Sequence, residues 1–523
     1  MKRLKLVGLA IAMASATPTF AGGLLTNTNQ HTAFNRMMSR EASIGIDGVY
    51  YNPAGVAFMN DGHHLSLNWQ MAFQSRTIKN SYPLFVNNTQ NATTDREFKG
   101  KAFAPVIPSL QYAYNRNGWS FQVNFALQGG GGKCEFGDGL GSFEKIVSET
   151  AIAASTLAGN VDQALGNAIG TPMQMFSSDQ YFGSKGSYSF TSYMRGRQYY
   201  YGLSLGAARR LGEHWSVGVG VRGVYAMANY YGYVKDIKVG NLPLYQVLDP
   251  SKESSADIEL NCDQTGLGIT PILSVDFKTG RWNFSAKYEF KTRLRLKNSS
   301  VNKAPSIGNL GDNLSNAMIS GLSQKIGQEG ATRVATAVLT NQTVTATMQS
   351  LKTQFDTKLE EAIGEYEDGK KIAGDIPAYL TLGAGYSPID ALRINVGFHW
   401  FDDKNATSYN NRNKLLKHGT LEYNAGAEYD VCKKVTVSAG WQSTNYGLSD
   451  EYMDDKSYVV SSNSVAFGGV YHISKKLDLN VAYFHTFYNH KKTEEVSSAT
   501  NLTYASDYTR NNNVLAVGVD FNF

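Results

Sequence analysis

Basic side chains recur at alternate positions in one segment of this chain, where they could bind an anionic group. Lys287, Lys291, Arg293 and Arg295 all occupy odd positions, so on one extended strand they would share a face. Arg222 occupies a comparable position in an earlier alternating segment. A cation removed from water binds carboxylate oxygens strongly, but such cations usually pair with acidic residues of the same protein. Both roles, ligand contact and structural ion pair, stay open for these five residues.

Other motifs that could carry chemistry do not meet the requirements of known sites. The glycine run before Lys133 is not a phosphate-binding loop, since that loop needs Gly, four residues and Gly-Lys-Ser/Thr, and position 134 is Cys. His63 and His64 have no accompanying metal-ligand frame, and neighbouring strand residues point to opposite faces. No nucleophile-and-base arrangement stands out, although triads assembled from distant strands can escape notice. We therefore expect no enzyme activity, cofactor or metal.

The elements that must position these cations are strands with a period of two. In the last nine residues, 515–523, every odd position is apolar and every even one is small or polar, and the chain ends on Phe523. One face of such a strand meets an apolar medium and the other meets small or polar groups. The same alternation recurs in 64–73, 119–127, 215–221, 282–290, 392–400, 435–441 and 477–483.

Connections of alternating length give the stronger architectural signal. Short polar turns are expected near 115–118, 210–214, 278–281, 387–391, 430–434 and 474–477. Longer loops are expected near 77–98, 129–196, 235–256, 298–374, 405–417, 448–458 and 492–504. Short turns at one rim and long loops at the other are typical of outer-membrane barrels. The sequence therefore predicts an all-β transmembrane antiparallel barrel of about 14 strands over residues 64–523, with both termini on the periplasmic side.

The amino terminus and the composition agree with this architecture. Residues 1–21 combine a basic start, an apolar stretch and the small-residue site Thr19-Phe20-Ala21, which is typical of a secretory signal peptide. Its removal takes three basic and no acidic residues, so the net charge falls from +5 to +2 and gives no support for nucleic-acid binding. A mean hydropathy of −0.31 excludes a bundle of membrane helices. The 31 Tyr, 25 Phe and 6 Trp suit aromatic girdles at two membrane interfaces.

Two of the long loops contain helical periodicity. Apolar residues repeat every three to four positions over 146–165, over 314–326 and over 351–363. We expect these helical insertions to fold over the outer mouth, either as a structural cap or as a landing site for a ligand. Cys134 and Cys262 both fall near the outer rim, and a disulfide between them is a hypothesis that the sequence alone cannot decide.

Residues 22–63 precede the first strand and are not strand-like. An amino-terminal segment of this length has no membrane face to occupy, so we expect it to fold inside the barrel as a plug. Its apolar residues can line a ligand pocket or simply pack the plug against the wall. They are Phe34, Met37, Met38, Ile44, Val49 and Tyr50.

The plug carries a motif that resembles a known family. Asn52-Pro53-Ala54-Gly55, about thirty residues beyond the signal cleavage site, is similar to the Asn-Pro-Ala motif in the hatch of FadL- and TodX-type transporters of hydrophobic compounds. Segments 210–220, 266–269 and 375–386 show further, less specific similarity. The resemblance implies a fourteen-stranded barrel closed by a hatch. It also implies ligand capture by outer loops, an apolar pocket in the lumen and release when the hatch rearranges.

In that family a kinked third strand opens the wall sideways. Here the third strand ends in Gly129-Gly130-Gly131-Gly132, which is a candidate for such a gap or else a flexible start to the long loop. The resemblance also implies a monomer inserted by the barrel-assembly machinery, which reads the strand ending in Phe523.

The leading prediction is outer-membrane transport of hydrophobic small molecules, with long-chain fatty acids as the first candidate cargo. A general porin-like channel, an outer-membrane enzyme and an adhesin built on the long loops are the alternatives. The plug disfavours an open porin, and the helical insertions are the support for an adhesin.

Overall fold

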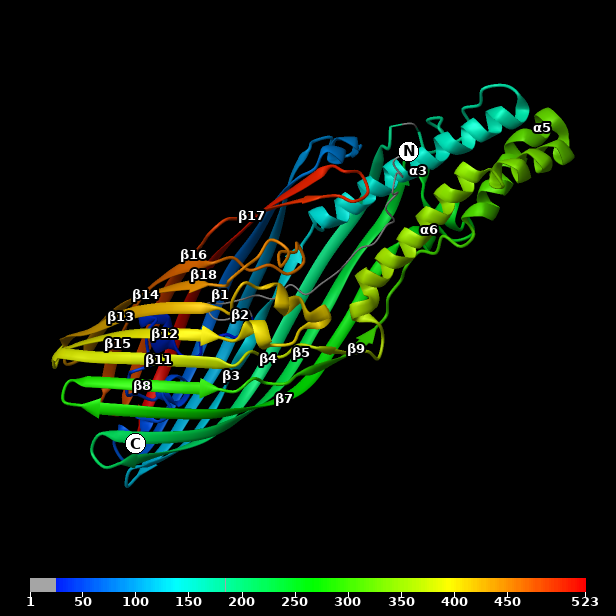
Figure 1. The fold of residues 1–523 in the computed structure, drawn as a ribbon. Coiled ribbons are helices and arrows are strands. Elements are labelled where there is room, and N and C mark those ends of the chain that lie inside the picture. Colours follow the sequence, from blue (N-terminus) through cyan, green and yellow to red (C-terminus); the bar gives the residue numbers. More distant parts are fainter. Residues whose placement is uncertain (1–24, 184) are drawn as a thin grey trace.

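The computed structural model describes residues 25–183 and 185–523, and the predicted signal peptide, 1–21, lies outside this part of the chain. The described chain forms a closed antiparallel barrel of 14 strands, as the sequence predicts (Figure 1). In order round the wall they are β1 (Gly62–Ser81), β2 (Asp95–Arg116), β3 (Trp119–Phe136), β4 (Tyr188–Leu211), β5 (Trp215–Val239), β7 (Ile258–Thr279), β8 (Trp282–Glu289), β11 (Tyr379–Ile389), β12 (Leu392–Phe401), β13 (Leu421–Cys432), β14 (Val435–Asn445), β15 (Ser462–Ser474), β16 (Leu477–Tyr488) and β18 (Thr503–Asn522). The short strands β6 (Leu242–Pro243), β9 (Arg295–Ser300), β10 (Lys371–Ala373) and β17 (Lys491–Val496) extend the sheet at the outer rim.

The barrel closes where its first and last strands pair. Leu65 lies opposite Phe521 and Trp69 opposite Val517, so the apolar residues of both strands point outward together. Trp69 and Val517 are 50% and 42% exposed, as an outer surface that faces lipid requires. Trp119, Trp215 and Trp282 each begin a strand at the short-turn end and are exposed there, where an aromatic girdle is expected.

All six predicted short turns are present, and the long loops all lie at the other rim. The turn between β2 and β3 has Asn117 and Gly118 at φ of 52° and 75°, the left-handed conformation that a tight hairpin of this type needs. One boundary differs from the prediction, because β3 continues through Gly129–Gly132 and ends at Phe136. The loop expected at 129–196 therefore begins after Phe136 and ends before Tyr188.

The helical insertions form an arm beyond the outer rim (Figure 1). The helices are α3 (Gly141–Ile169), α5 (Leu310–Leu339) and α6 (Gln342–Ile363), with the short α4 (Tyr245–Leu248) at their base. Leu157 and Val161 of α3 and Met318 and Leu322 of α5 belong to one apolar core, which continues down to the upper strands. No helix in the described chain combines the length and apolar character needed to cross a bilayer.

The segment before β1 folds inside the barrel as the sequence predicts, and we call residues 25–61 the hatch (Figure 1). Its elements are α1 (Thr32–Met37), α2 (Gly48–Tyr51) and a 3-10 turn, η1 (Gly55–Phe58). The wall makes room for it with glycines: a Cβ at Gly426 or Gly440 would collide with the Met37 carbonyl, and one at Gly383 would lie 2.6 Å from the Glu41 Cβ. Glycine at these inward positions lets the two backbones approach closely.

Candidate functional site

The Asn-Pro-Ala-Gly motif fastens the hatch to three wall strands. The Asn52 amide donates to Asp276 of β7 at 2.5 Å, while its oxygen accepts from the Gly55 N–H at 3.1 Å. Gln122 of β3 donates to the Pro53 carbonyl and Ser216 of β5 to the Ala54 carbonyl, each at 2.7 Å. These contacts indicate that the motif shapes and anchors the hatch.

Buried ion pairs form a second attachment. Arg36 of α1 pairs with Glu428 of β13 and also donates to Ser438 at 2.9 Å and Asn480 at 3.3 Å. Arg40 lies 3.1 Å from the same Glu428 and donates twice to Asp47, at 2.7 and 3.0 Å. Burial alone would lower the pKa of Arg40, but the two carboxylates outweigh it and raise that pKa. Hatch and wall thus share a charge cluster that excludes water.

Glu41 and His399 form a third attachment. The Glu41 carboxylate accepts from His399 Nε2 of β12 at 2.6 Å, and the other ring nitrogen lies 2.8 Å from Glu422. Both Glu41 and His399 are fully buried. Burial by itself would raise the pKa of Glu41, but the charge and hydrogen bond of His399 outweigh it and lower that pKa. This attachment was not foreseen, because nothing in the sequence pairs a hatch acid with a wall histidine more than 350 residues away.

The apolar hatch residues divide into several groups. Phe34 stacks on Tyr51 with centroids 5.1 Å apart, Met37 packs against wall glycines, and Val49 belongs to a small core with Ile46, Val56 and Ala113. Ile44 is half-buried. Met38 alone among the six predicted residues joins the apolar patch on the wall, which also contains Ala72, Ala104, Ile107, Leu127, Ala466, Phe484 and Val514. We call this set the lumen patch.

Arg222 and Lys287 point into the lumen, as the strand parity predicts. Both contact Glu289: the Arg222 Nη2 donates to it at 3.0 Å and the Lys287 Nζ at 2.8 Å. Lys287 also donates to the carbonyl of Tyr50 in the hatch at 2.8 Å. The geometry therefore makes these cations part of the hatch attachment, since their charge is balanced by a wall acid.

The inward orientation predicted for Lys291, Arg293 and Arg295 is wrong. β8 ends at Glu289 and β9 starts at Arg295, and across the break the buried positions change from odd to even, so that Leu294 and Leu296 point inward. Arg293 is exposed, while Lys291 and Arg295 lie 3.8 and 2.7 Å from Asp375. Parity persists only along an unbroken strand, which is why the prediction fails here.

The wall has a gap in its hydrogen-bond ladder between β2 and β3. Pairing stops after Phe103↔Lys133 and resumes at Leu110↔Phe125. The unpaired stretch of β3 contains the predicted glycines 129–132, and that of β2 contains Pro105 and Pro108, which have no N–H to donate. Glycines on one strand and prolines on the other thus prevent a regular ladder.

The start of the hatch covers this gap. The Asn27 N–H donates to the Gln128 carbonyl at 2.7 Å, and its side chain donates to the Leu127 carbonyl at 3.2 Å. Gln30 adds a bond to the same Leu127 carbonyl at 3.3 Å. The hatch therefore occupies carbonyls that β2 would use in an ordinary barrel.

The disulfide hypothesis is wrong. Cys134 lies opposite Gly196, Gly196 opposite Tyr230, and Tyr230 opposite Cys262, so two strands separate the cysteines. Three strand spacings amount to about 14 Å, whereas the Cα atoms of a disulfide lie within about 7 Å. Both thiols are buried and free.

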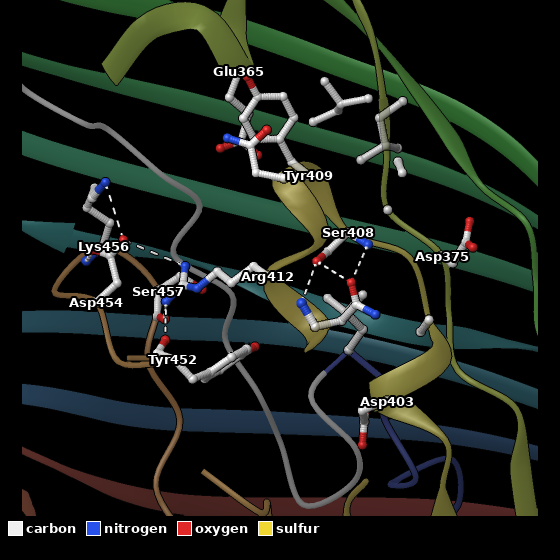
Figure 2. A pocket seen from close by; sticks show the side chains of 18 of the residues that line it. Glu365, Asp375, Asp403, Ser408, Tyr409, Arg412, Tyr452, Asp454, Lys456 and Ser457 are labelled. Carbon is white, nitrogen blue, oxygen red and sulfur yellow. Dashed lines mark hydrogen bonds and ion pairs between the residues drawn. The ribbon is translucent and has the colours of Figure 1, made fainter. Parts of the chain in front are cut away.

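A pocket of about 410 Å³ lies between the barrel mouth and the outer loops (Figure 2). Its apolar lining includes Tyr200, Leu296, Ile372, Tyr409 and Tyr452. Arg412 donates to the Tyr452 carbonyl and lies 3.6 Å from Asp454, which also pairs with Lys456 at 3.3 Å. Burial raises the pKa of Glu365 to about 7, so this acid changes charge near neutrality. The pocket has a size typical of small-molecule sites.

Sequence reasoning missed two buried arginines, Arg76 of β1 and Arg510 of β18. The expected strands stopped short of both positions. The signal was nonetheless present, since continuing the even-numbered inward positions up the first and last strands reaches both residues.

Solved structures with similar folds include a Pseudomonas aeruginosa FadL homologue, with 13% identity, a TM-score of 0.59 and coverage of 96% of this chain and 100% of that chain. The chain has the FadL-type fold. A mutant of TodX, described as a monoaromatic hydrocarbon channel, has 14% identity, a TM-score of 0.51 and coverage of 94% and 98%. No protein-family model and no curated protein matches the sequence. At these identities the likeness establishes the FadL-type fold, and the roles of individual residues rest on the geometry above.

Proposed function

We propose that this chain carries hydrophobic small molecules across the bacterial outer membrane, with long-chain fatty acids as the cargo. The ligand enters the pocket beneath the outer loops and moves to the lumen patch. It leaves when the hatch withdraws from the gap between β2 and β3. Both termini lie on the periplasmic side in this proposal, and the protein works as a monomer.

The observation that carries the proposal is the hatch segment on the open ladder. A gap in a transmembrane wall leaves backbone carbonyls without partners, which is costly away from water. Asn27 and Gln30 supply donors to those carbonyls from a segment that is not part of the wall. Movement of the hatch would therefore expose a side exit, and burying apolar ligand surface there gains about 25 cal/mol per Å².

A reversible crosslink tests this mechanism. The Asn27 N–H bonds to the Gln128 carbonyl at 2.7 Å, so the two residues are neighbours of the kind that a disulfide can join. Asn27→Cys with Gln128→Cys, in a Cys432→Ser background, should block uptake of labelled oleate by cells that lack their own transporter. A reductant should restore uptake, and each single-cysteine variant should transport normally.

Two results would contradict the proposal. Uptake that persists with the crosslink formed would exclude release through the gap. A large steady conductance of the purified wild-type protein in planar bilayers would instead indicate an open porin.

A further inference from the structure

Arg76 and Arg510 bring two guanidinium groups together inside the barrel. They are direct cross-strand partners on β1 and β18, and only 1% and 5% of their surfaces are exposed. Like charges directly opposite each other on a sheet repel, and buried charges are costly without an opposite charge. A pair of this kind is expected only where an anion offsets the repulsion.

The surroundings of Arg76 do not supply that anion. The titratable groups that act on it most strongly are Arg510, Cys134, Tyr458 and Tyr488, none of them a carboxylate. Its Nε donates to Gln74 at 3.2 Å, but its Nη2 has no hydrogen-bond partner among the described residues. The other cations of the lumen differ in this respect, since Arg36, Arg222 and Lys287 each contact a glutamate.

The residues around the pair complete a polar cradle. Tyr458 lies beneath both guanidinium groups, with its ring 6.0 Å from Arg76 and 5.2 Å from Arg510. Its hydroxyl donates to the carbonyls of Thr77 and Thr509, which fixes the ring between the two strands. One row toward the periplasm, fully buried Asn512 has no partner for either side-chain atom within the described chain. The cradle therefore offers a free Nη and a free amide donor from neighbouring rows.

An apolar surface begins directly below the cradle. Ala72 and Val514 face each other two inward rows beyond the arginines and belong to the lumen patch, whose hatch member is Met38. Four residues of strand separate Arg76 from Ala72, a distance of about 13 Å. A head group at the arginines would thus place an alkyl chain on the patch, with its end toward the hatch.

We propose that Arg76 and Arg510 hold the anionic head group of a single-chain amphiphile whose alkyl chain lies on the lumen patch. The inference rests on the proposed transport function and adds a polarity requirement to it: the head must carry anionic oxygens. Carboxylates and sulfates share that chemistry, whereas alcohols and hydrocarbons of the same length lack it.

Calorimetric titration of the full-length protein in an uncharged detergent separates these ligands. Oleate and dodecyl sulfate are the anionic probes, oleyl alcohol is the neutral probe, and sodium sulfate lacks a chain. Arg76→Gln and Arg510→Gln should each weaken both anionic amphiphiles by at least about tenfold, and leave oleyl alcohol unchanged. Arg76→Lys should retain part of the affinity. Arg209→Gln, a change at the short-turn rim where Arg209 lies over Trp119, should have no effect.

The outcomes distinguish the site from the transport function. Unchanged oleate and dodecyl sulfate affinity in the double variant would overturn the anion site, while oleyl alcohol binding would leave hydrophobic transport intact. Absence of binding by every chain-bearing ligand to the wild type would overturn both. Heat-modifiable migration on gels shows that each variant is folded, so a loss of affinity can be assigned to the site.

Discussion

Removing the charge of Glu428 should release the hatch more than removing Arg36 does. In Glu428→Gln, Arg40 keeps Asp47 and Arg393 keeps Asp430, but Arg36 is left with the neutral partners Ser438 and Asn480. Leaving one buried charge without its partner costs about 4 kcal/mol. At about 1.4 kcal/mol for each factor of ten, the ratio of docked to undocked hatch should fall roughly a thousandfold.

Arg36→Met should have a smaller effect, because Glu428 retains Arg40 at 3.1 Å and Arg393 at 3.4 Å. The loss is that of hydrogen bonds to a charged group, about 2 kcal/mol. In the double variant every remaining cation of the cluster keeps an acid, so its hatch should be better docked than in Glu428→Gln alone.

Hydrogen exchange of residues 25–61 and single-channel conductance measure hatch docking independently. Exchange and opening frequency should both rank Glu428→Gln highest, the double variant lower and the wild type lowest. Asp390→Asn, which removes an exposed partner of Arg281 at the rim, is the control and should match the wild type. A double variant that exchanges faster than Glu428→Gln would refute the reasoning, since no buried cation would then explain the loss.

Three further results are expected. Gly440→Val should prevent hatch docking and raise conductance, because its side chain would overlap the Met37 carbonyl, whereas Gly223→Val, on the outward face with no atom nearer than 4.0 Å, should not; equal conductance would contradict close packing of hatch and wall. Since the pKa of Glu365 is raised to about 7, its neutral form is favoured below that pH and its charge enters the pocket above it. Binding of uncharged hexadecanol should therefore be tighter at pH 6 than at pH 8, and Glu365→Gln should abolish the difference, which titration at both pH values would show. Alkylation of the denatured, unreduced protein should modify all three cysteines, and a mass with only one modification would restore the disulfide.

The barrel was predictable because a membrane wall imposes a local rule on sequence. Alternation marks each strand, and short turns such as Asn117-Gly118 mark each hairpin, so strand number and order follow from residues close together in the chain. The rule holds while a strand is unbroken. It fails at 290–294, where one irregular segment moves Arg293 and Arg295 to the opposite face.

The attachments of the hatch were not predictable in the same way. Glu41 meets His399, and Arg36 meets Glu428, across hundreds of residues, and only the closed barrel determines which wall residues face which part of the hatch. The wall gap lies between these cases. The glycines of β3 were visible in the sequence, but the prolines that complete the gap belong to β2, and their alignment depends on strand register.

The chemistry of the hatch interface suits a part that must move. A hatch held by a large apolar face would expose that face when it withdrew, at a cost proportional to the area. This hatch is held instead by Arg36, Arg40, Glu41 and Asn52, each paired with a polar or charged wall group. Water can replace such partners when the hatch opens, because exchange of a protein hydrogen bond for one to water changes the free energy by only about 1 kcal/mol. The apolar contact made by Met38 is placed at the lumen patch, where a bound alkyl chain can substitute for it. An interface built this way stays closed in the absence of ligand and loses little that water or ligand cannot replace when it opens.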